Sequence, residues 1–245
     1  MRIIVTALAL FAPALAACSP PANNASGPIL LFTGTGTSPG DVAALEAVLT
    51  ANRLDYVAVS SAELNAMGEA DMRRYRLLVL PGGNFVTMGN SLTPRATAHI
   101  RRAVASGVNY LGVCAGAFLA GSFPQPYNSV NLTSGVQFGF YAEIRQVHKA
   151  AVAITGADGV TLDQYWEDGP QLSGWGAVVA KYPDGTPAVV EGTSGSGWVI
   201  LTGIHPEATE SWRRGMAFAT PSATDNAFAA TLIQAALNRT SLPHF

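Results

Sequence analysis

Residues 108–116 read VNYLGVCAG, an apolar run that ends in a small-residue turn around Cys114. The run predicts a buried strand, and the residues after it predict a sharp turn into a helix that starts near Ala115. Gly112 and Gly116 flank the cysteine and relieve the crowding of such a turn, as in a nucleophile elbow with cysteine in place of serine. A helix N-terminus also favours negative charge on the sulfur. Cys114 is therefore a candidate nucleophile, and the alternative is an inert core thiol.

Strands and helices alternate on the N-terminal side of this turn. Apolar runs predict short strands, and apolar residues at helical spacing predict the helices between them. Continuous apolar strands separated by helices indicate an α/β fold, in which helices cover both faces of a mostly parallel, flavodoxin-like sheet. The expected strands are 28–32, 56–59, 76–80 and 108–113, and the expected helices are 41–52 and 93–106.

The second half of the chain is richer in predicted strands. Short apolar runs separated by turn residues predict four strands, and one apolar helix follows them. We expect one domain over residues 28–240. The strands are 159–162, 176–182, 187–191 and 198–203, and the helix is 225–238.

The composition excludes several classes of protein. Hydrophobic residues make up 49% of the 245 residues and charged residues 12%, which argues against disorder. The formal charge is −2, and no basic run offers the footprint of a nucleic-acid-binding surface. We therefore expect no nucleic-acid partner, and nothing in the sequence points to a particular protein partner.

The N-terminus predicts an exported protein. Residues 1–17 have a short charged start and an apolar core too short to span a membrane, as in a signal peptide. The residues Leu15 to Cys18 resemble a bacterial lipobox. The resemblance implies that Cys18 is lipidated and that residues 18–27 form a flexible tether. It also implies that the protein is periplasmic and anchored to the outer membrane. The lipid would be its only membrane contact. Ordinary cleavage at Ala14 to Ala16 would release a soluble periplasmic protein instead.

A second group of candidate residues follows the predicted strand 198–203. Residues two apart in an extended segment point the same way, so Glu207 can accept a hydrogen bond from one nitrogen of His205 while the other nitrogen faces a thiol. Pro206 keeps this segment extended. Functional groups of a parallel sheet gather at the carboxyl ends of its strands, where both His205 and Cys114 are expected.

Three loops complete the candidate site. Gly82 and Gly83, in PGGN at residues 81–84, allow backbone N–H groups to approach a reacting carbonyl, so Gly83 and Ala115 could form an oxyanion hole. We also expect the glycine-rich loop 34–40 at the mouth of the site. The loop 165–170 is expected to form a wall. Tentative substrate contacts are Asn84, Tyr165 and Trp166.

No metal site or cofactor is predicted. His99, His148 and His244 have no cysteine or carboxylate at metal-ligand spacing.

The order of Pro81-Gly82-Gly83, the Cys114 turn and His205-Pro206-Glu207 resembles the class I glutamine amidotransferase-like superfamily, which implies a Cys-His-Glu triad. Together with GTGTSPG at residues 34–40 and YWEDGP at residues 165–170, the chain from residue 28 onward resembles the N-terminal domain of biotin-protein ligases. The resemblance implies Cys114 as nucleophile, His205 as base, Glu207 as orienting carboxylate, and oxyanion donors near Gly83 and Ala115. It does not imply biotin ligation, because the ligase catalytic domain has no counterpart in this chain.

These observations predict hydrolysis of an amide or related acyl bond through a thioester, on a small-molecule or peptide-like substrate. A second hypothesis is a catalytically silent binding module in which Tyr165 and Trp166 stack on a ligand. A third is redox chemistry at Cys114.

Overall fold

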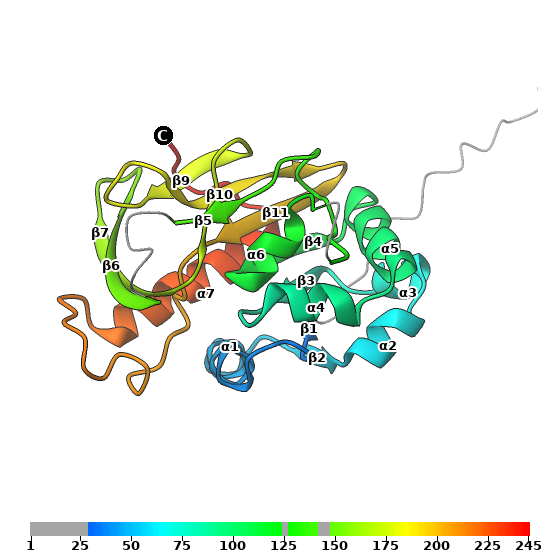
Figure 1. The fold of residues 1–245 in the computed structure, drawn as a ribbon, viewed down its shortest axis with the longest axis horizontal. Helices are drawn as coiled ribbons and strands as arrows, with labels where there is room; N and C mark the ends of the chain where they lie inside the picture. The colour runs from blue at the N-terminus through cyan, green and yellow to red at the C-terminus, as the bar shows by residue number, and fades with distance from the viewer. Residues whose placement is uncertain (1–28, 124–126, 142–147) are drawn as a thin grey trace, which may run out of the picture.

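The computed structural model describes residues 29–123, 127–141 and 148–245. Its centre is a nine-stranded sheet with the order β2-β1-β3-β4-β11-β10-β9-β6-β7, and a two-stranded sheet joins β5 to β8. Figure 1 shows α6 on the near side of the central strands and α7 behind them. The parallel α/β core flanked by helices, with an additional antiparallel part, is the fold that the sequence predicts.

The first five strands of the large sheet are parallel to one another. From the pair β11–β10 onward, each strand is antiparallel to the one before it. In sheet order the parallel strands are β2 (Tyr56–Val59), β1 (Ile29–Phe32), β3 (Leu77–Leu80), β4 (Asn109–Val113) and β11 (Gly197–Thr202). The antiparallel strands are β10 (Pro187–Ser194), β9 (Ala177–Lys181), β6 (Lys149–Gly156) and β7 (Thr161–Glu167), and the small sheet holds β5 (Gly139–Phe140) and β8 (Pro170–Gln171).

Helices cover the two faces of the sheet. Side chains of α1 and α7 pack in one buried cluster, and those of the other helices pack in a second cluster. The first pair is α1 (Pro39–Ala51) and α7 (Ser222–Asn238). The second group is α2 (Ser61–Ala66), α3 (Glu69–Met72), α4 (Phe85–Ser91), α5 (Pro94–Ala105) and α6 (Ala115–Ala120).

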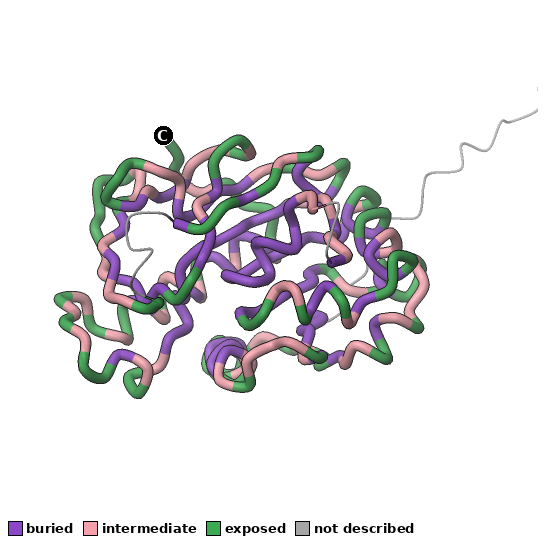
Figure 2. The backbone as a smooth tube through the Cα atoms, in the orientation of Figure 1, coloured by how far each residue is buried: buried purple, intermediate pink, exposed green. Residues whose placement is uncertain are grey.

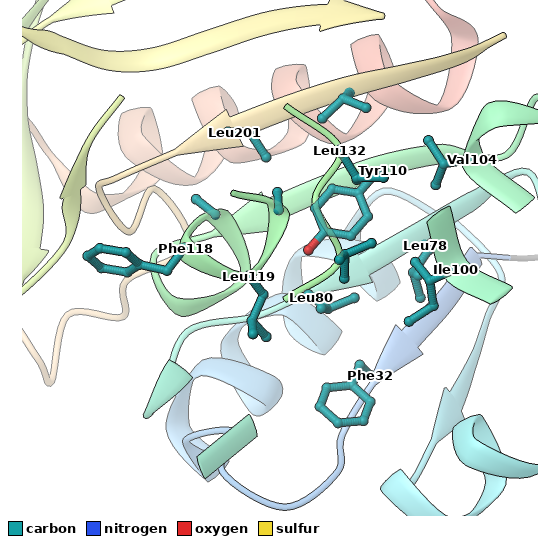
Figure 3. Packing of buried hydrophobic residues seen from close by; sticks show 14 of the residues in the cluster. Phe32, Leu78, Leu80, Ile100, Val104, Tyr110, Phe118, Leu119, Leu132 and Leu201 are labelled. Atoms are coloured by element: carbon teal, nitrogen blue, oxygen red, sulfur yellow. The ribbon is translucent and has the colours of Figure 1, made fainter. Parts of the chain in front are cut away.

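Strand β1 shows how the sequence supplies both clusters. Successive side chains of a strand point to opposite faces, so Leu30 and Phe32 enter one cluster while Ile29 and Leu31 enter the other. Each fully buried leucine contributes roughly 2 kcal/mol through the water that it excludes. Figure 3 shows the first cluster, and Figure 2 shows that the buried backbone runs through the central strands and α6.

The antiparallel part departs from the expectation. A strand was expected at 159–162 and a loop at 165–170, but the structure has the hairpin β6–β7, with Tyr165, Trp166 and Glu167 inside β7. Polar and apolar residues are mixed along this hairpin, so its alternation is weak. The sequence analysis also does not find the short helices α2, α3 and α4, which have too few turns to show a clear period.

Candidate active site

Cys114 lies at the turn between β4 and α6. Its backbone has φ +49° and ψ −103°, a conformation that costs energy for a residue with a side chain. The surrounding structure holds it there, since its N–H donates to the carbonyl of Thr202 on the neighbouring strand at 2.8 Å. The side chain is 6% exposed, and the sulfur lies 3.5 Å from the carbonyl oxygen of Glu167.

The glycines on either side make this tight turn possible. A Cβ atom on Gly116 would lie 2.0 Å from the carbonyl oxygen of Leu80, and one on Gly112 would lie 2.6 Å from the carbonyl oxygen of Gly116. Both approaches are to backbone atoms that cannot move aside independently. The backbone therefore requires glycine at both positions, for the crowding reason that the sequence predicts.

His205 follows β11, the strand next to β4 in the sheet. Its N–H donates to the carbonyl of Tyr165 at 2.8 Å, which joins it to β7. His205 and Cys114 line the same cavity. The two residues that the sequence places at separate strand ends thus meet at one site.

Two buried carboxylates meet the other side of the imidazole. Nδ1 of His205 lies 3.0 Å from Glu207 Oε1 and 2.9 Å from Asp41 Oδ1. Because Nδ1 carries a single hydrogen, only one carboxylate can accept it in line, and the bond is formed with Glu207. Nε2 is left for the sulfur of Cys114. Asp41 can come this close to the imidazole ring because residue 82 is a glycine. A Cβ atom on Gly82 would lie 2.0 Å from Asp41 Oδ1 and 2.6 Å from the ring.

The charges around the ring set its protonation. Burial alone would lower the pKa of His205, but the charges of Cys114 and Glu207 and the contact with Asp41 raise that pKa well above its ordinary value. Burial raises the pKa of Glu207, against the opposing effect of His205. For Asp41, burial is outweighed by His205, and the pKa is lowered. The ring therefore holds a proton over a wide pH range.

Asp41 is the residue that sequence reasoning missed. It lies in the first turn of α1, whose N-cap Ser38 accepts a hydrogen bond from the Asp41 N–H at 3.4 Å. An acidic residue in a first helical turn has an ordinary role beside the helix dipole, so it attracts no notice in a sequence. The available signal was its position just after the first strand of a parallel sheet, at the edge where functional groups gather.

A cavity of about 350 Å³ opens above the sulfur. In the described part of the chain, the N–H groups of Gly83 and Ala115 have no backbone acceptor, so both remain available as donors. The cavity is lined by Ser38, Asp41, Gly83, Asn84, Phe85, Cys114, Phe118, Phe140, Glu167, Asp168 and His205.

Of the three tentative substrate residues, one lines the cavity and two are buried. Asn84 lines the cavity while its Oδ1 caps α4 by accepting from the N–H of Thr87 at 2.9 Å. Trp166 is 1% exposed and donates to the carbonyl of Gly169, so it cannot stack on a ligand in this cavity. Tyr165 is also buried, and its hydroxyl donates to Glu167 at 2.5 Å. Tyr165 therefore supports the wall from behind.

Asp41, His205 and Glu207 could also hold a metal ion. One ligand atom from each lies within 4.8 Å of the others, and all three residues are buried. Nitrogen and carboxylate ligands in this arrangement suit a divalent ion such as Zn²⁺. The sequence predicts no metal site because the spacing of residues along the chain cannot reveal that Asp41, on another element, lies beside His205 and Glu207.

The leader 1–17 and the whole tether 18–27, which includes Cys18, lie outside the described residues. Among the residues that are described, none of the helices is long and apolar enough to cross a membrane.

Comparison with known proteins supports the fold. Residues 28–145 match the family described as "Biotin-protein ligase, N terminal". A solved structure titled "Crystal structure of glutamine amidotransferase" is 20% identical with a TM-score of 0.58, covering 75% of this chain and 93% of that one. "PurLQS from Thermotoga maritima" is 19% identical with a TM-score of 0.56, covering 84% and 97%.

A similar fold also forms part of larger enzymes. A β-galactosidase from Bacillus circulans sp. alkalophilus is 13% identical with a TM-score of 0.52, and the match covers 88% of this chain and 31% of that one. No curated protein matches the sequence at a significant level. At these identities the solved structures establish the fold alone.

The family match and the fold agree with the resemblance seen in the motifs. Residues 28–145 match the biotin-protein ligase N-terminal family, and the chain has a fold like that of the glutamine amidotransferase structures.

Proposed function

We propose that this protein hydrolyses an amide or related acyl bond, with Cys114 as nucleophile. The observation that carries the proposal is that the buried His205 lines one cavity with Cys114, while its Nδ1 lies 3.0 Å from Glu207 Oε1. A nucleophile, a base and an orienting carboxylate in such an arrangement are the parts of a catalytic triad. The strained backbone at Cys114 adds support, because such strain gathers at functional sites.

The reaction proceeds in two steps. The Cys114 sulfur forms a bond to the carbonyl carbon of the substrate, the carbon–nitrogen bond breaks, and the proton on His205 passes to the leaving amine. Water then attacks the thioester, His205 takes a proton from that water, and the carbon–sulfur bond breaks, which releases the carboxylic acid and restores the Cys114 thiolate beside the protonated His205. The N–H groups of Gly83 and Ala115 are placed to donate to the oxyanion that forms in each step.

Covalent labelling tests the nucleophile directly. The chain has two cysteines, so a Cys18→Ser variant leaves Cys114 as the only thiol. We expect this protein to gain one adduct from iodoacetamide, and Cys114→Ala in the same background to gain none. His205→Ala should slow the reaction at pH 7 by tenfold or more, because the imidazolium no longer stabilises a thiolate. Intact-protein mass spectrometry measures both rates.

Circular dichroism of each variant is the control for folding. A folded His205→Ala variant that reacts as fast as the parent would overturn the proposal, because His205 would then have no influence on the sulfur. Equal reactivity of native and urea-unfolded protein would lead to the same conclusion.

We also propose that the protein is exported and anchored by lipid on Cys18. The support is the sequence of residues 15–18, LAAC, after an apolar leader. Expression in a bacterium fed with radiolabelled palmitate should label the parent and not Cys18→Ala. A processed but unlabelled parent would instead indicate ordinary signal cleavage.

A binding module remains the second candidate. The observation in its favour is the wall of three phenylalanine rings in the cavity, which offers apolar contact without chemistry. Under this alternative, Cys114→Ser would leave ligand affinity and cellular function unchanged. Loss of function in Cys114→Ser with retained ligand affinity would exclude it.

A further inference from the structure

The walls of the cavity above Cys114 differ in chemistry. One wall consists of Phe85, Phe118 and Phe140, whose ring centroids lie 4.4 to 5.9 Å apart. In Figure 3 the ring of Phe118 lies apart from the other labelled side chains. Phe140 is 48% exposed, which is unusual for so large an apolar side chain. Phe140 and the half-buried Phe85 offer an apolar surface to a ligand, and Phe118, which is 2% exposed, packs beneath them.

The other wall carries the carboxylates of Glu167 and Asp168. The carbonyl oxygen of Glu167 lies 3.5 Å from the sulfur of Cys114, so this wall is next to the reacting atom. Among the described lining residues there is no lysine or arginine, and His205 already faces carboxylates. Of the described residues that line the cavity, those next to an anionic group bound here would carry like charges, and none is a lysine or arginine.

The structure holds both carboxylates in position. Tyr165 donates to Oε2 of Glu167 at 2.5 Å, which leaves Oε1 of that carboxylate for a ligand. Asp168 has φ +45°, a conformation that aspartate tolerates better than most residues, and its N–H donates to the carbonyl of His148 at 2.9 Å. The Nδ1 atom of His148 lies 3.0 Å from the Asp168 carboxylate, on an exposed surface where water weakens the pairing.

We propose that the site accepts acyl compounds whose acyl half carries both a positively charged amino group and an apolar, preferably aromatic, group. Amides of aromatic amino acids with a free α-ammonium are the simplest members of this class. The ammonium binds between Glu167 and Asp168, the aromatic group lies on the phenylalanine wall, and the acyl carbon then lies near Cys114. This inference rests on the proposed function, because it names the substrate class of the same nucleophile.

The test compares three chloromethyl ketones that differ only at the amino group. Phenylalanyl chloromethyl ketone carries an ammonium, its N-acetyl derivative is neutral, and its N-succinyl derivative is anionic. The rate of Cys114 alkylation by each is measured in the Cys18→Ser background and divided by its rate with free cysteine. We expect the cationic compound to react at least tenfold faster than the neutral one, and the anionic compound to react slowest.

Variants of the acidic wall assign the preference to its residues. In Glu167→Gln and in Asp168→Asn the ratio of cationic to neutral rates should fall at least threefold, and in the double variant it should approach one. Asp55→Asn is the matched control, since Asp55 is an exposed carboxylate at the opposite edge of the sheet. The ratio should also fall with added salt, which screens exposed charges.

The outcomes separate the two proposals. If iodoacetamide does not modify Cys114, the nucleophile itself fails, and with it the proposed function. If iodoacetamide reacts but the cationic ketone shows no advantage, the substrate class is wrong while the proposed function stands. A ratio that is unchanged in the double variant would likewise overturn the role of this wall.

Discussion

The parallel strands and the β6–β7 hairpin reach the same cavity in different ways. Cys114 and His205 follow β4 and β11, which are neighbours in the sheet and fixed by a parallel ladder. Glu167 and Asp168 come from β7, at the opposite end of the strand order from β2. The end of β7 returns to the site because Tyr165 pairs with His205 in an isolated antiparallel bridge.

The two regions hold their side chains with different rigidity. In the parallel region the reacting groups are buried and depend on close backbone approaches at Gly82 and Gly116. In the hairpin the charged groups are exposed and depend on single side-chain hydrogen bonds. A parallel core can therefore keep one chemistry while a hairpin wall changes what it recognises. Variants in the first region should cost folding and reactivity, and variants in the second should mainly change selectivity.

The largest effect is expected for Gly116→Ala in the parallel region. The added Cβ would lie 2.0 Å from the carbonyl oxygen of Leu80, a backbone atom on β3 that can move only with its strand. We expect a loss of about 3 kcal/mol in the free energy of unfolding, as for an overpacked core. Urea denaturation measures this loss.

Gly139→Ala, in β5 of the small sheet, is the matched control. The added Cβ would have one neighbour within 4 Å, the flexible end of Gln171 at 3.8 Å. The free energy of unfolding should therefore change by less than about 0.5 kcal/mol. Equal stabilities for the two variants would mean that the Cys114 turn is not tightly packed.

The same contrast explains how much of the fold could be predicted. The parallel strands are continuous apolar runs of buried residues, such as Leu77–Leu80, and their helices have clear caps, such as Thr93 before α5. Both signals are local in the sequence. The hairpin β6–β7 mixes buried and exposed residues, and its placement depends on contacts with residues far away in the chain. Sequence patterns therefore predicted the first region well and the second poorly.

The site divides in the same way. Cys114, His205, Glu207, Gly82 and Gly83 were found because short motifs mark them at strand ends. Asp41 was missed because its carboxylate meets His205 only after α1 packs beside the sheet. The phenylalanine wall was missed because α4, α6 and β5 supply one ring each. No local pattern can report a contact between three separate elements.

Within the parallel region, the two carboxylates at His205 should differ in importance. We expect Glu207→Gln to lower the alkylation rate of Cys114 by about a hundredfold, because Glu207 accepts the Nδ1 hydrogen and fixes the ring. Asp41→Asn should lower it only about threefold, since Asp41 Oδ1 lies 2.9 Å from Nδ1 while the in-line hydrogen bond goes to Glu207. Alkylation at pH 7 measures both. The reverse order would identify Asp41 as the residue that orients the ring.

A buried carboxyl on α7, which is bonded to the hairpin, should make stability depend on pH. Burial raises the pKa of Asp225 to about 7, against the pull of Arg213, while Gln164 on β7 donates to it at 2.9 Å. A carboxyl whose pKa is raised on folding binds its proton more tightly in the folded state, so this stabilisation is present at low pH and is lost as the pH rises from about 4 to 7.

We expect Asp225→Asn to remove this loss. Urea denaturation of both proteins from pH 4 to pH 8 measures the difference. Parallel pH dependences for the parent and the variant would contradict the assignment to Asp225.

The smallest effect is expected for Tyr165→Phe, which touches the link between the two regions. Burial and the neighbouring Glu167 raise the pKa of Tyr165, so its hydroxyl keeps the hydrogen that it donates to Glu167. Removing the hydroxyl should cost about 0.5 kcal/mol of stability. It should also lower the preference for the cationic ketone by about threefold, because the Glu167 side chain gains freedom. The reaction with iodoacetamide reports separately on the sulfur of Cys114. In this variant the backbone of residue 165 still pairs with His205, the residue next to that sulfur. A preference that falls while iodoacetamide reactivity persists would show that the hairpin controls recognition without controlling the nucleophile.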